Sequence, residues 1–552
     1  MESKLSTLPA LFEQSTPPDM RKVLYFDLNG QEISYAIFYN RVELVTEMLK
    51  RQKIRKGDII AILSDNLANW ACAYFAVART GAIALPLMPE MTDHDLTLFL
   101  NAHEVQLAFT CESQKQRLMN LNVKSLTTLI VLENFALEKL PEDRINVQEK
   151  LGREFEKFKK AAREFIGRPD EEETVEIEPN DPFCILYVPD TQNQWRQIYL
   201  THQNITSAAA IVADRLSLKD THRIAVFLPL SLTLPALLGI MVPLLVNAQA
   251  VLLIKPQNTR QLQNYLQQFN PTHLFTDSAF AEWVFKGSKK AEVQETLLKR
   301  SLRVISRLVS GVLGKSGKTE SLELKKYHWL ICTNFVPLGK QFKQYLQKQK
   351  IEHQLMLGNF ETASVFLTGQ VNDEFCWIEG KILPEFDWDI TSAQPKGDSG
   401  ELRLKGPMVS VNKVEQNEQN DGYLHTGWLA RKTDGTLQIL GRKESRIVLP
   451  DGKQIFPELI EATLNEYDWV ADSMVYLESN ALFVRLYPDP EKAGELSRQY
   501  PERLAIELLQ NINKTLPSQA QLKGVSIEDE PFKKNIFGQI LREGQSNTAA
   551  KP

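Results

Sequence analysis

The chain has 552 residues, of which 43% are hydrophobic and 24% are charged, and its formal net charge is −5. These values are typical of a globular protein with large hydrophobic cores, and they argue against a nucleic-acid-binding surface spread over the molecule. Glycine is scarce, since the sequence holds 26 where average usage predicts about 39, which excludes collagen-like and glycine-rich linker architectures.

Cysteine spacing bears on the compartment of the protein. The five cysteines are far apart and form neither a Cys-x-x-Cys pair nor a cluster with histidine; they are Cys72, Cys111, Cys184, Cys332 and Cys376. This spacing gives no support for a zinc site or a disulfide framework and favours a reducing compartment. The first residues, MESKLSTLPALFEQ, lack the apolar core of a signal peptide. We therefore expect a cytoplasmic protein.

The first 110 residues alternate between helical and strand patterns. Residues 38–50 and 66–80 have helical spacing of apolar side chains, whereas 58–63 and 82–86 are short apolar strands. The same alternation returns over 205–280. Strands that alternate with helices predict βαβ units and a parallel sheet, so we expect an α/β fold.

Two charged segments interrupt this alternation. Residues 146–180 predict a charged helical segment and an acidic patch, in which six of the nine residues 170–178 are acids. This patch is most simply a solvated linker. Residues 286–318 hold nine Lys or Arg and two acids, with apolar residues at helical spacing. A basic amphipathic helix can bind an anionic membrane surface, but we favour a packed helix with a solvated basic face.

An uncharged stretch over residues 225–254 is long enough to span a membrane. Three prolines, Pro229, Pro235 and Pro243, punctuate it. Because prolines mark the ends of elements, we favour a buried strand, a helix and a second strand in an α/β core.

The last part of the chain changes to short strands with turns. A small α/β unit is predicted at the C-terminus, with strands around 474–477 and 482–487 and a helix over 502–515. The best boundary lies near Gly441, so we predict one domain over 1–440 and a second over 441–552.

Several motifs occur in an order that points to a known family. They run from DIIAIL at 58–63 through NW, TGA, LPL, LTHQN, FLPLS and GYLHTG to GRKESRIVLPDGKQIFPELIE at 441–461. In this order the chain resembles the adenylate-forming (AMP-binding) superfamily, specifically the long-chain fatty-acid:CoA ligases. The last motif is the most specific, and the correspondence covers about residues 8–545.

The resemblance implies a fold and a reaction. It implies an acyl-CoA synthetase-like fold, with a large N-terminal domain of mixed parallel sheets and a small β subregion. A small mobile C-terminal domain would turn about a hinge near 442–445. In such ligases a carboxylate attacks the α-phosphate of Mg-ATP to give an acyl-adenylate, and the thiol of coenzyme A then displaces AMP.

The segment that matches the family's phosphate-binding loop departs from its pattern. The family reads Tyr-Thr-Ser-Gly-Thr-Thr-Gly, one residue, then Pro-Lys-Gly, whereas residues 187–197 read YVPDTQNQWRQ. Thr191 keeps a hydroxyl and Arg196 keeps the charge of the lysine. Pro189 has no N–H to donate, and Asp190 would repel a polyphosphate. Arginine binds phosphate, but it does not replace a loop of backbone donors.

The next two motifs have changed around the nucleotide. The adenine turn reads TNFVPL, so Asn334 lies in the turn and Phe335 would occupy space where the base approaches. The following motif reads LGNFE, in which Phe360 replaces the phosphate-binding threonine. Glu361 keeps the carboxylate that the resemblance implies as a catalytic residue and magnesium ligand. A glutamate in a packed segment could equally be a capping or surface residue.

Two more positions have lost the family residue. Trp428 replaces the ribose-binding aspartate, and an indole donates one hydrogen bond but accepts none. Gln539 stands at the position of the catalytic adenylation lysine, where it loses the charge-assisted contact to the carboxylate and α-phosphate. Arg442 keeps the hinge arginine, whereas Ser445 replaces the hinge carboxylate.

These departures lead to three hypotheses. The first is a ligase-fold protein that makes no acyl-adenylate and either binds a lipid carboxylate or is the non-catalytic partner of an active ligase or acyl carrier. The second is a divergent but active ligase that uses Thr191, Arg196, Glu361 and Arg442. The third is a membrane-surface or partner-binding scaffold that acts through 286–318. We favour the first, and we expect ATP, magnesium and coenzyme A as cofactors only if activity is retained.

Overall fold

The computed structural model of the protein describes residues 6–17, 19–26, 32–140, 176–190, 193–287, 324–334, 336–370, 377–391, 399–410, 422–433, 435–490 and 501–542. Nearly all of the predicted charged segment 146–180 and basic segment 286–318 lie outside the described residues. Thr191 and Phe335 also lie outside them.

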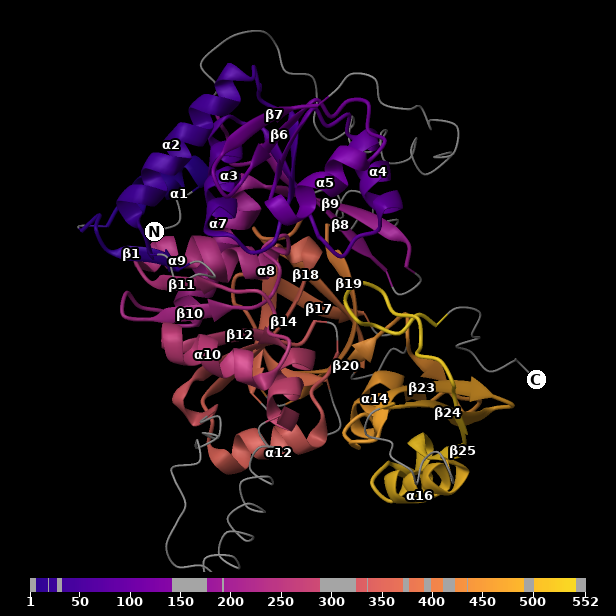
Figure 1. The fold of residues 1–552 in the computed structure, drawn as a ribbon. Helices are drawn as coiled ribbons and strands as arrows, with labels where there is room; N and C mark the ends of the chain where they lie inside the picture. The colour runs from indigo at the N-terminus through magenta and orange to yellow at the C-terminus, as the bar shows by residue number, and fades with distance from the viewer. Residues whose placement is uncertain are drawn as a thin grey trace, which may run out of the picture.

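The first sheet has seven strands in the order β7-β6-β5-β3-β4-β8-β9. Figure 1 labels β6 to β9 in the upper part of the view. Its strands are β3 (Ile59–Leu63), β4 (Ile83–Leu87), β5 (Leu107–Thr110), β6 (Thr128–Val131), β7 (Ala136–Lys139), β8 (Pro182–Pro189) and β9 (Trp195–Thr201). The five central strands pair in parallel, and the edge strands β7 and β9 pair antiparallel. The parallel α/β sheet predicted from the alternating patterns is therefore confirmed.

The second sheet has thirteen strands in the order β17-β18-β19-β20-β16-β15-β14-β13-β12-β10-β11-β1-β2. Strands β14 to β1 of this order pair in parallel, and antiparallel strands extend both ends. The strands are β1 (Val23–Phe26), β2 (Glu32–Ser34), β10 (Arg223–Val226), β11 (Gln249–Leu252), β12 (His273–Asp277), β13 (His328–Cys332), β14 (His353–Asn359), β15 (Ser364–Gln370), β16 (Ile378–Ile382), β17 (Asp387–Thr391), β18 (Ser399–Lys405), β19 (Leu424–Thr433) and β20 (Thr436–Arg442).

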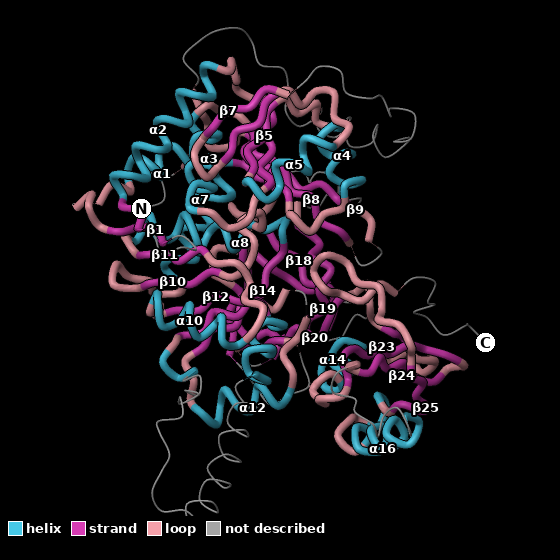
Figure 2. Tube along the Cα trace, viewed as in Figure 1, coloured by secondary structure: helices cyan, strands magenta, loops and turns pink. Residues whose placement is uncertain are grey.

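Helices pack around and between the two sheets (Figure 2). They include α1 (Leu8–Gln14), α2 (Tyr35–Arg51), α3 (Ala68–Arg79), α4 (Asp93–Ala102), α5 (Glu112–Asn120), α7 (His202–Arg215), α10 (Thr259–Phe269) and α12 (Lys340–Gln349). Helix α3 is buried from Ala68 to Ala78, because its alanines let neighbouring elements approach closely. One hydrophobic cluster joins α3 and α7 to strands of both sheets.

The LTHQN motif marks the junction of β9 and α7. Thr201 is the N-cap of α7, and its hydroxyl accepts from the Asn204 N–H while the Asn204 side chain accepts from the Thr201 N–H. This capping box satisfies two backbone donors and fixes where the helix begins. The Asn204 amide also donates to the Pro407 carbonyl at 2.8 Å, which ties the first sheet to the antiparallel strands.

The uncharged stretch forms a strand, a broken helix and a second strand, as predicted. Strand β10 leads to α8 (Thr233–Ala236), a π-helical turn over Leu237–Met241, α9 (Val242–Val246) and then β11. Pro243 lies in the first turn of α9, directly after the π-helical turn, where the helical hydrogen-bonding pattern changes. Among the described residues, no helix is long and apolar enough to cross a membrane.

The C-terminal part forms a smaller domain with its own hydrophobic cluster. Strands β23 (Val470–Glu478), β24 (Ala481–Pro488) and β25 (Leu522–Ile527) make a three-stranded sheet beside α14 (Pro457–Leu464) and α16 (Pro501–Asn513). A two-stranded ribbon of β21 (Ile447–Val448) and β22 (Gln454–Ile455) leads into it. The predicted strands and helix of this region are confirmed, whereas the boundary at residue 440 stays a prediction.

Candidate functional site

A cleft of about 520 Å³ lies between the large domain and the C-terminal domain. It is lined by the β8–β9 hairpin, the ends of β13 and β14, strands β18 and β19, the segment 442–446 and the loop after β25. Five of the predicted site residues line it: Arg196, Asn334, Glu361, Arg442 and Gln539. Trp428 follows Gly427, which also lines the cleft. Thr191 lies outside the described residues.

The β8–β9 hairpin, which carries the phosphate-loop segment, ends in a closed turn. The Asp190 N–H donates to the Gln194 carbonyl at 2.9 Å, and the Gln194 N–H donates to the Asp190 carboxylate at 2.8 Å. The Asn193 N–H donates to the Asp190 carbonyl at 3.0 Å. A phosphate-binding loop needs N–H groups that point at the ligand. The N–H groups of these three residues are instead used within the turn.

The side chains that follow this turn are held by the first sheet and its helices. The Trp195 indole donates to Asp95 on α4 at 2.9 Å. The side-chain amide of Gln197 donates to the Tyr187 hydroxyl at 2.5 Å, and the Tyr199 hydroxyl donates to Oε1 of Gln197 at 2.9 Å. Positions 195 and 197 therefore serve packing and internal hydrogen bonding.

Arg196 and Glu361 form an ion pair in the cleft. Nη1 of Arg196 lies 3.1 Å from Oε1 of Glu361, and the Glu361 side chain is only 7% exposed. Glu361 is placed by the 3-10 turn Phe360–Thr362 that follows β14. The guanidinium therefore contacts one of the two oxygens of the carboxylate that the resemblance implies as a magnesium ligand.

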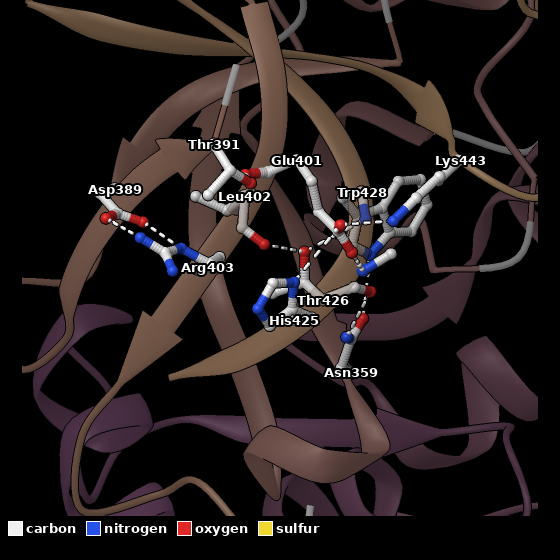
Figure 3. A network of polar contacts seen from close by, with 11 residues as sticks. Asn359, Asp389, Thr391, Glu401, Leu402, Arg403, His425, Thr426, Trp428 and Lys443 are labelled. Atoms are coloured by element: carbon white, nitrogen blue, oxygen red, sulfur yellow. Dashed lines mark hydrogen bonds and ion pairs between the residues drawn. The ribbon is translucent and has the colours of Figure 1, made fainter. Parts of the chain in front are cut away.

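Trp428 is fully buried on β19. Its indole donates to Oδ1 of Asn359 at 2.9 Å, and the Asn359 amide donates to the Thr426 carbonyl at 2.9 Å (Figure 3). The Trp377 ring meets the Trp428 ring edge-on, with 5.0 Å between centroids. Because the single donor of the indole is already used, this position offers a ribose neither an acceptor nor a donor.

Arg442 lies at the end of β20, over the buried tryptophan. Its guanidinium carbon is 4.4 Å from the centroid of the Trp428 ring, which is cation–π geometry. Its Nη2 donates to the Asn334 carbonyl, and the Asn334 side chain accepts from the Gly358 N–H at 2.8 Å. Burial lowers the pKa of Arg442. The predicted adenine-turn residue and hinge arginine thus contact each other.

A second polar network surrounds Glu401 on β18 (Figure 3). Lys443 Nζ donates to Oε2 of Glu401 at 2.7 Å, and the Gly427 N–H donates to Oε1 at 3.2 Å. Nδ1 of His425 lies 3.4 Å from Oε2. Although burial acts to raise it, the pKa of Glu401 is lowered by the hydrogen bond and charge of Lys443, with His425 adding to the effect.

Phe360 separates the cleft from a small apolar pocket. The pocket has a volume of about 20 Å³ and lies at the ends of β10, β12, β13 and β14. This space admits about one water molecule, far less than an acyl chain. On the cleft side, Phe360 stacks on Phe537 of the C-terminal loop, with 5.5 Å between ring centroids.

Gln539 belongs to a tight turn in that C-terminal loop. The Asn535 side chain accepts from the N–H groups of Phe537 and Gln539, at 3.0 and 3.1 Å. The Asn535 amide donates to Oε1 of Gln539 at 2.9 Å. The Gln539 side chain therefore reaches the cleft while it is partly used to hold its own turn.

The donors and acceptors in the cleft do not fit Mg-ATP. Glu361 is paired with Arg196, the described hairpin donors are used within the turn, and Trp428 has no acceptor for a ribose. Across the described ranges, no group of three or more His, Cys, Asp or Glu side chains could hold a metal ion.

Four residues that shape the cleft are not predicted from the sequence, which are Asn359, Glu401, Lys443 and Phe537. All four contact partners distant in the chain, which spacing does not reveal. Phe537 gave no clear signal either, because the loop after β25 also holds Phe532, Ile536, Ile540 and Leu541.

Two features define the class of protein. The large domain is built on two extended sheets, and the positions singled out by the sequence resemblance line a cleft beside a small C-terminal domain. A family model described as AMP-binding enzyme matches residues 12–411. This match covers more than half of the chain, so the chain belongs to the AMP-binding enzyme family.

Its relatives include fatty-acid ligases. The chain is 23% identical over 562 residues to long-chain-fatty-acid–CoA ligase 5 of Mus musculus, covering 91% of this chain and 80% of that protein. It is 22% identical over 503 residues to fatty acyl-CoA synthetase B of Dictyostelium discoideum, covering 84% and 72%. These relatives confirm the acyl-CoA synthetase resemblance.

Solved structures share the fold. A benzoate CoA ligase from Burkholderia xenovorans LB400 has a TM-score of 0.69 at 16% sequence identity, covering 97% of this chain and 99% of that chain. At this identity the likeness shows the fold alone, which is a large N-terminal domain with a smaller C-terminal domain.

Proposed function

We propose that this member of the AMP-binding family keeps the fold of a fatty-acid:CoA ligase but does not form acyl-adenylates. The observation that carries the proposal is the ion pair of Arg196 and Glu361. A magnesium ion needs free carboxylate oxygens. A guanidinium tethered beside this carboxylate competes with the metal without supplying its coordination chemistry.

The other nucleotide positions support the same proposal. Removing one positioned electrostatic group from an active site costs about 100- to 1000-fold in rate. Gln539 has no charge to contact the α-phosphate, and Trp428 uses its one donor internally. Each loss alone could be compensated. Together, the paired Glu361, the uncharged Gln539 and the occupied donor of Trp428 leave the transition state without its main stabilising contacts.

Isothermal titration of the full chain with Mg-ATP tests this proposal. We expect no binding with a Kd below 1 mM, together with no shift in the melting temperature, while an active long-chain ligase run in parallel binds normally. Micromolar binding by this chain would overturn the proposal.

A divergent active ligase is the second candidate function. The cleft of about 520 Å³ with Glu361, Arg442 and Gln539 on its walls favours this alternative. Fatty-acid-dependent release of pyrophosphate in the presence of Mg-ATP and coenzyme A would establish it. The proposal above predicts no release over a range of acyl chain lengths.

The role of the non-adenylating protein is part of the same proposal. We place it as a cytoplasmic lipid-carboxylate binder or a non-catalytic partner of an active ligase, with domains over 1–440 and 441–552. The small pocket behind Phe360 bears on this choice, since a fatty acid would have to displace surrounding side chains. Binding of a fluorescent fatty acid, compared between the wild-type chain and Phe360→Ala, separates the two roles.

A further inference from the structure

The two domains touch at the ends of two helices. Helix α12 of the large domain begins at Lys340, and its N-cap Gly339 has no side chain to satisfy the first helical donors. The Glu466 carboxylate of the C-terminal domain accepts from the Gln341 N–H in this first turn. The C-terminal domain therefore supplies the cap that the sequence of α12 lacks.

The neighbouring residue makes the reciprocal contact. Helix α14 of the C-terminal domain ends at Leu464, with Asn465 as its C-cap. Lys286 Nζ of the large domain donates to the Asn465 carbonyl at 2.7 Å. An anion is thus placed at the N-terminus of one helix and a cation at the C-terminus of the other, and both placements are favoured by the helix dipoles.

Close packing at Gly339 makes this arrangement specific. A Cβ atom at position 339 would lie 2.7 Å from Oε1 of Glu466 and 3.1 Å from Oε1 of Glu282. Glu282 accepts from the Gly339 N–H, so two carboxylates converge on this helix end. Only a glycine leaves room for Glu466 at this distance.

A third interdomain contact lies on the other side of a cavity. The stacked rings of Phe360 and Phe537 join the large domain to the C-terminal loop. A cavity of about 500 Å³, lined by Lys286, Asn465 and Gln539, lies between this contact and the helix ends. The helix-end pair and the ring stack are separated by this cavity, so together they resist rotation of the C-terminal domain better than either would alone.

We propose that the helix-end pair and the Phe360–Phe537 stack form an interdomain latch, which holds the C-terminal domain over the cleft in one orientation through protein contacts alone. While the latch is closed, Phe537 stacks on Phe360, which also lines the small apolar pocket. The latch does not rest on the proposed function, because an active ligase would be held in the same way.

Distance measurements between spin labels test the latch in the full chain. Labels are attached at Lys348→Cys on α12 and Gln510→Cys on α16, both exposed positions, in a Cys376→Ser background. We expect one narrow distance distribution for the otherwise wild-type chain. Glu466→Ala or Phe537→Ala alone should raise the ratio of opened to latched molecules about 5- to 10-fold. The double variant should raise it about 50-fold if the two contacts act independently.

Two further variants separate the latch from general effects. Glu507→Ala removes an exposed carboxylate of the same domain and should leave the distribution unchanged. Gly339→Ala displaces Glu466 without removing any charge, and it should increase hydrogen exchange at the Gln341 amide even if Phe537→Ala fails to fold. A broad distribution in the wild-type chain would overturn the proposal. Unchanged distance and exchange in Glu466→Ala and Gly339→Ala would also overturn it.

Discussion

Arg196 and Glu361 are 165 residues apart in the chain and meet at 3.1 Å. The Glu361 side chain is nearly buried, whereas the Arg196 side chain as a whole is 40% exposed. Water therefore screens part of the Arg196 charge but hardly reaches the Glu361 carboxylate. The carboxylate consequently needs the arginine to compensate its charge more than the arginine needs the carboxylate.

Replacement of Arg196 by alanine should destabilise the fold by leaving Glu361 buried and unpaired. We expect the free energy of unfolding to fall by about 1–2 kcal/mol at pH 7, a value reduced by the partial exposure of Arg196. Urea denaturation measures this change. In Arg196→Ala/Glu361→Gln, most of the loss should disappear.

A matched variant distinguishes this effect from the loss of any arginine. Arg215 is 38% exposed and pairs with Glu385 at 2.7 Å, but Glu385 is more exposed than Glu361. Arg215→Ala should cost about 0.5 kcal/mol or less. Equal costs for the two variants would contradict a special dependence of Glu361 on Arg196.

At the scale of elements, the first sheet holds a buried histidine that makes it sensitive to acid. His103 follows α4 and lies 2.9 Å from the Tyr187 hydroxyl on β8. Burial lowers the pKa of His103 to about 4. In the unfolded chain His103 binds a proton near pH 6.5. The stability that the neutral His103 contributes is therefore fully present above pH 6.5 and is lost as the pH falls toward 4.

Between pH 7 and pH 5, His103 should lower the free energy of unfolding by about 2 kcal/mol. His103→Gln should remove this loss, so its free energy of unfolding should fall less steeply with acidification. Chemical denaturation at several pH values measures the slopes. The exposed His94 in the first turn of α4 is the control, and His94→Gln should keep the wild-type slope. Identical slopes for both variants would refute the assignment.

Regular elements could be predicted because their signals are local. The pattern over 38–50 became α2, and 502–515 became α16, with shifts of a few residues at the ends. Periodic apolar residues and capping side chains lie within a few positions of each other, so the sequence displays them directly.

The contents of the cleft were harder to predict, because they depend on pairs that are distant in the chain. The changes at Asp190 and Trp428 were visible as departures from a family pattern. That Trp428 would donate to Asn359, 69 residues away, was not. The sequence could show which family contacts were lost, but not which new contacts replaced them.

At the scale of the whole molecule, the C-terminal domain has a core separate from that of the large domain. A buried ion pair fixes its last loop, since Arg542 Nη2 contacts both Glu461 oxygens, at 2.8 and 2.7 Å. The Arg542 charge also stabilises the Glu461 carboxylate, whose pKa burial raises.

Arg542→Ala should unfold the C-terminal domain before the large domain. Breaking a buried ion pair costs about 3–5 kcal/mol, and in a domain of about a hundred residues this lowers the melting temperature by more than about 10 °C. Scanning calorimetry should show a separate transition at lower temperature. Arg485→Ala, whose pair with Glu528 is partly exposed at 4.0 Å, should change little. One transition that shifts as a whole would contradict independent cores.

The tethered cation at Glu361 also has a consequence for how this cleft responds to its surroundings. A bound metal exchanges with the solution, so chelators and changes in ion supply alter the charge of a site that depends on it. Arg196 is joined to the chain by covalent bonds and cannot exchange with the solution. The charge balance around this carboxylate is therefore set when the polypeptide is synthesised, and fluctuations in divalent ion concentration cannot reset it.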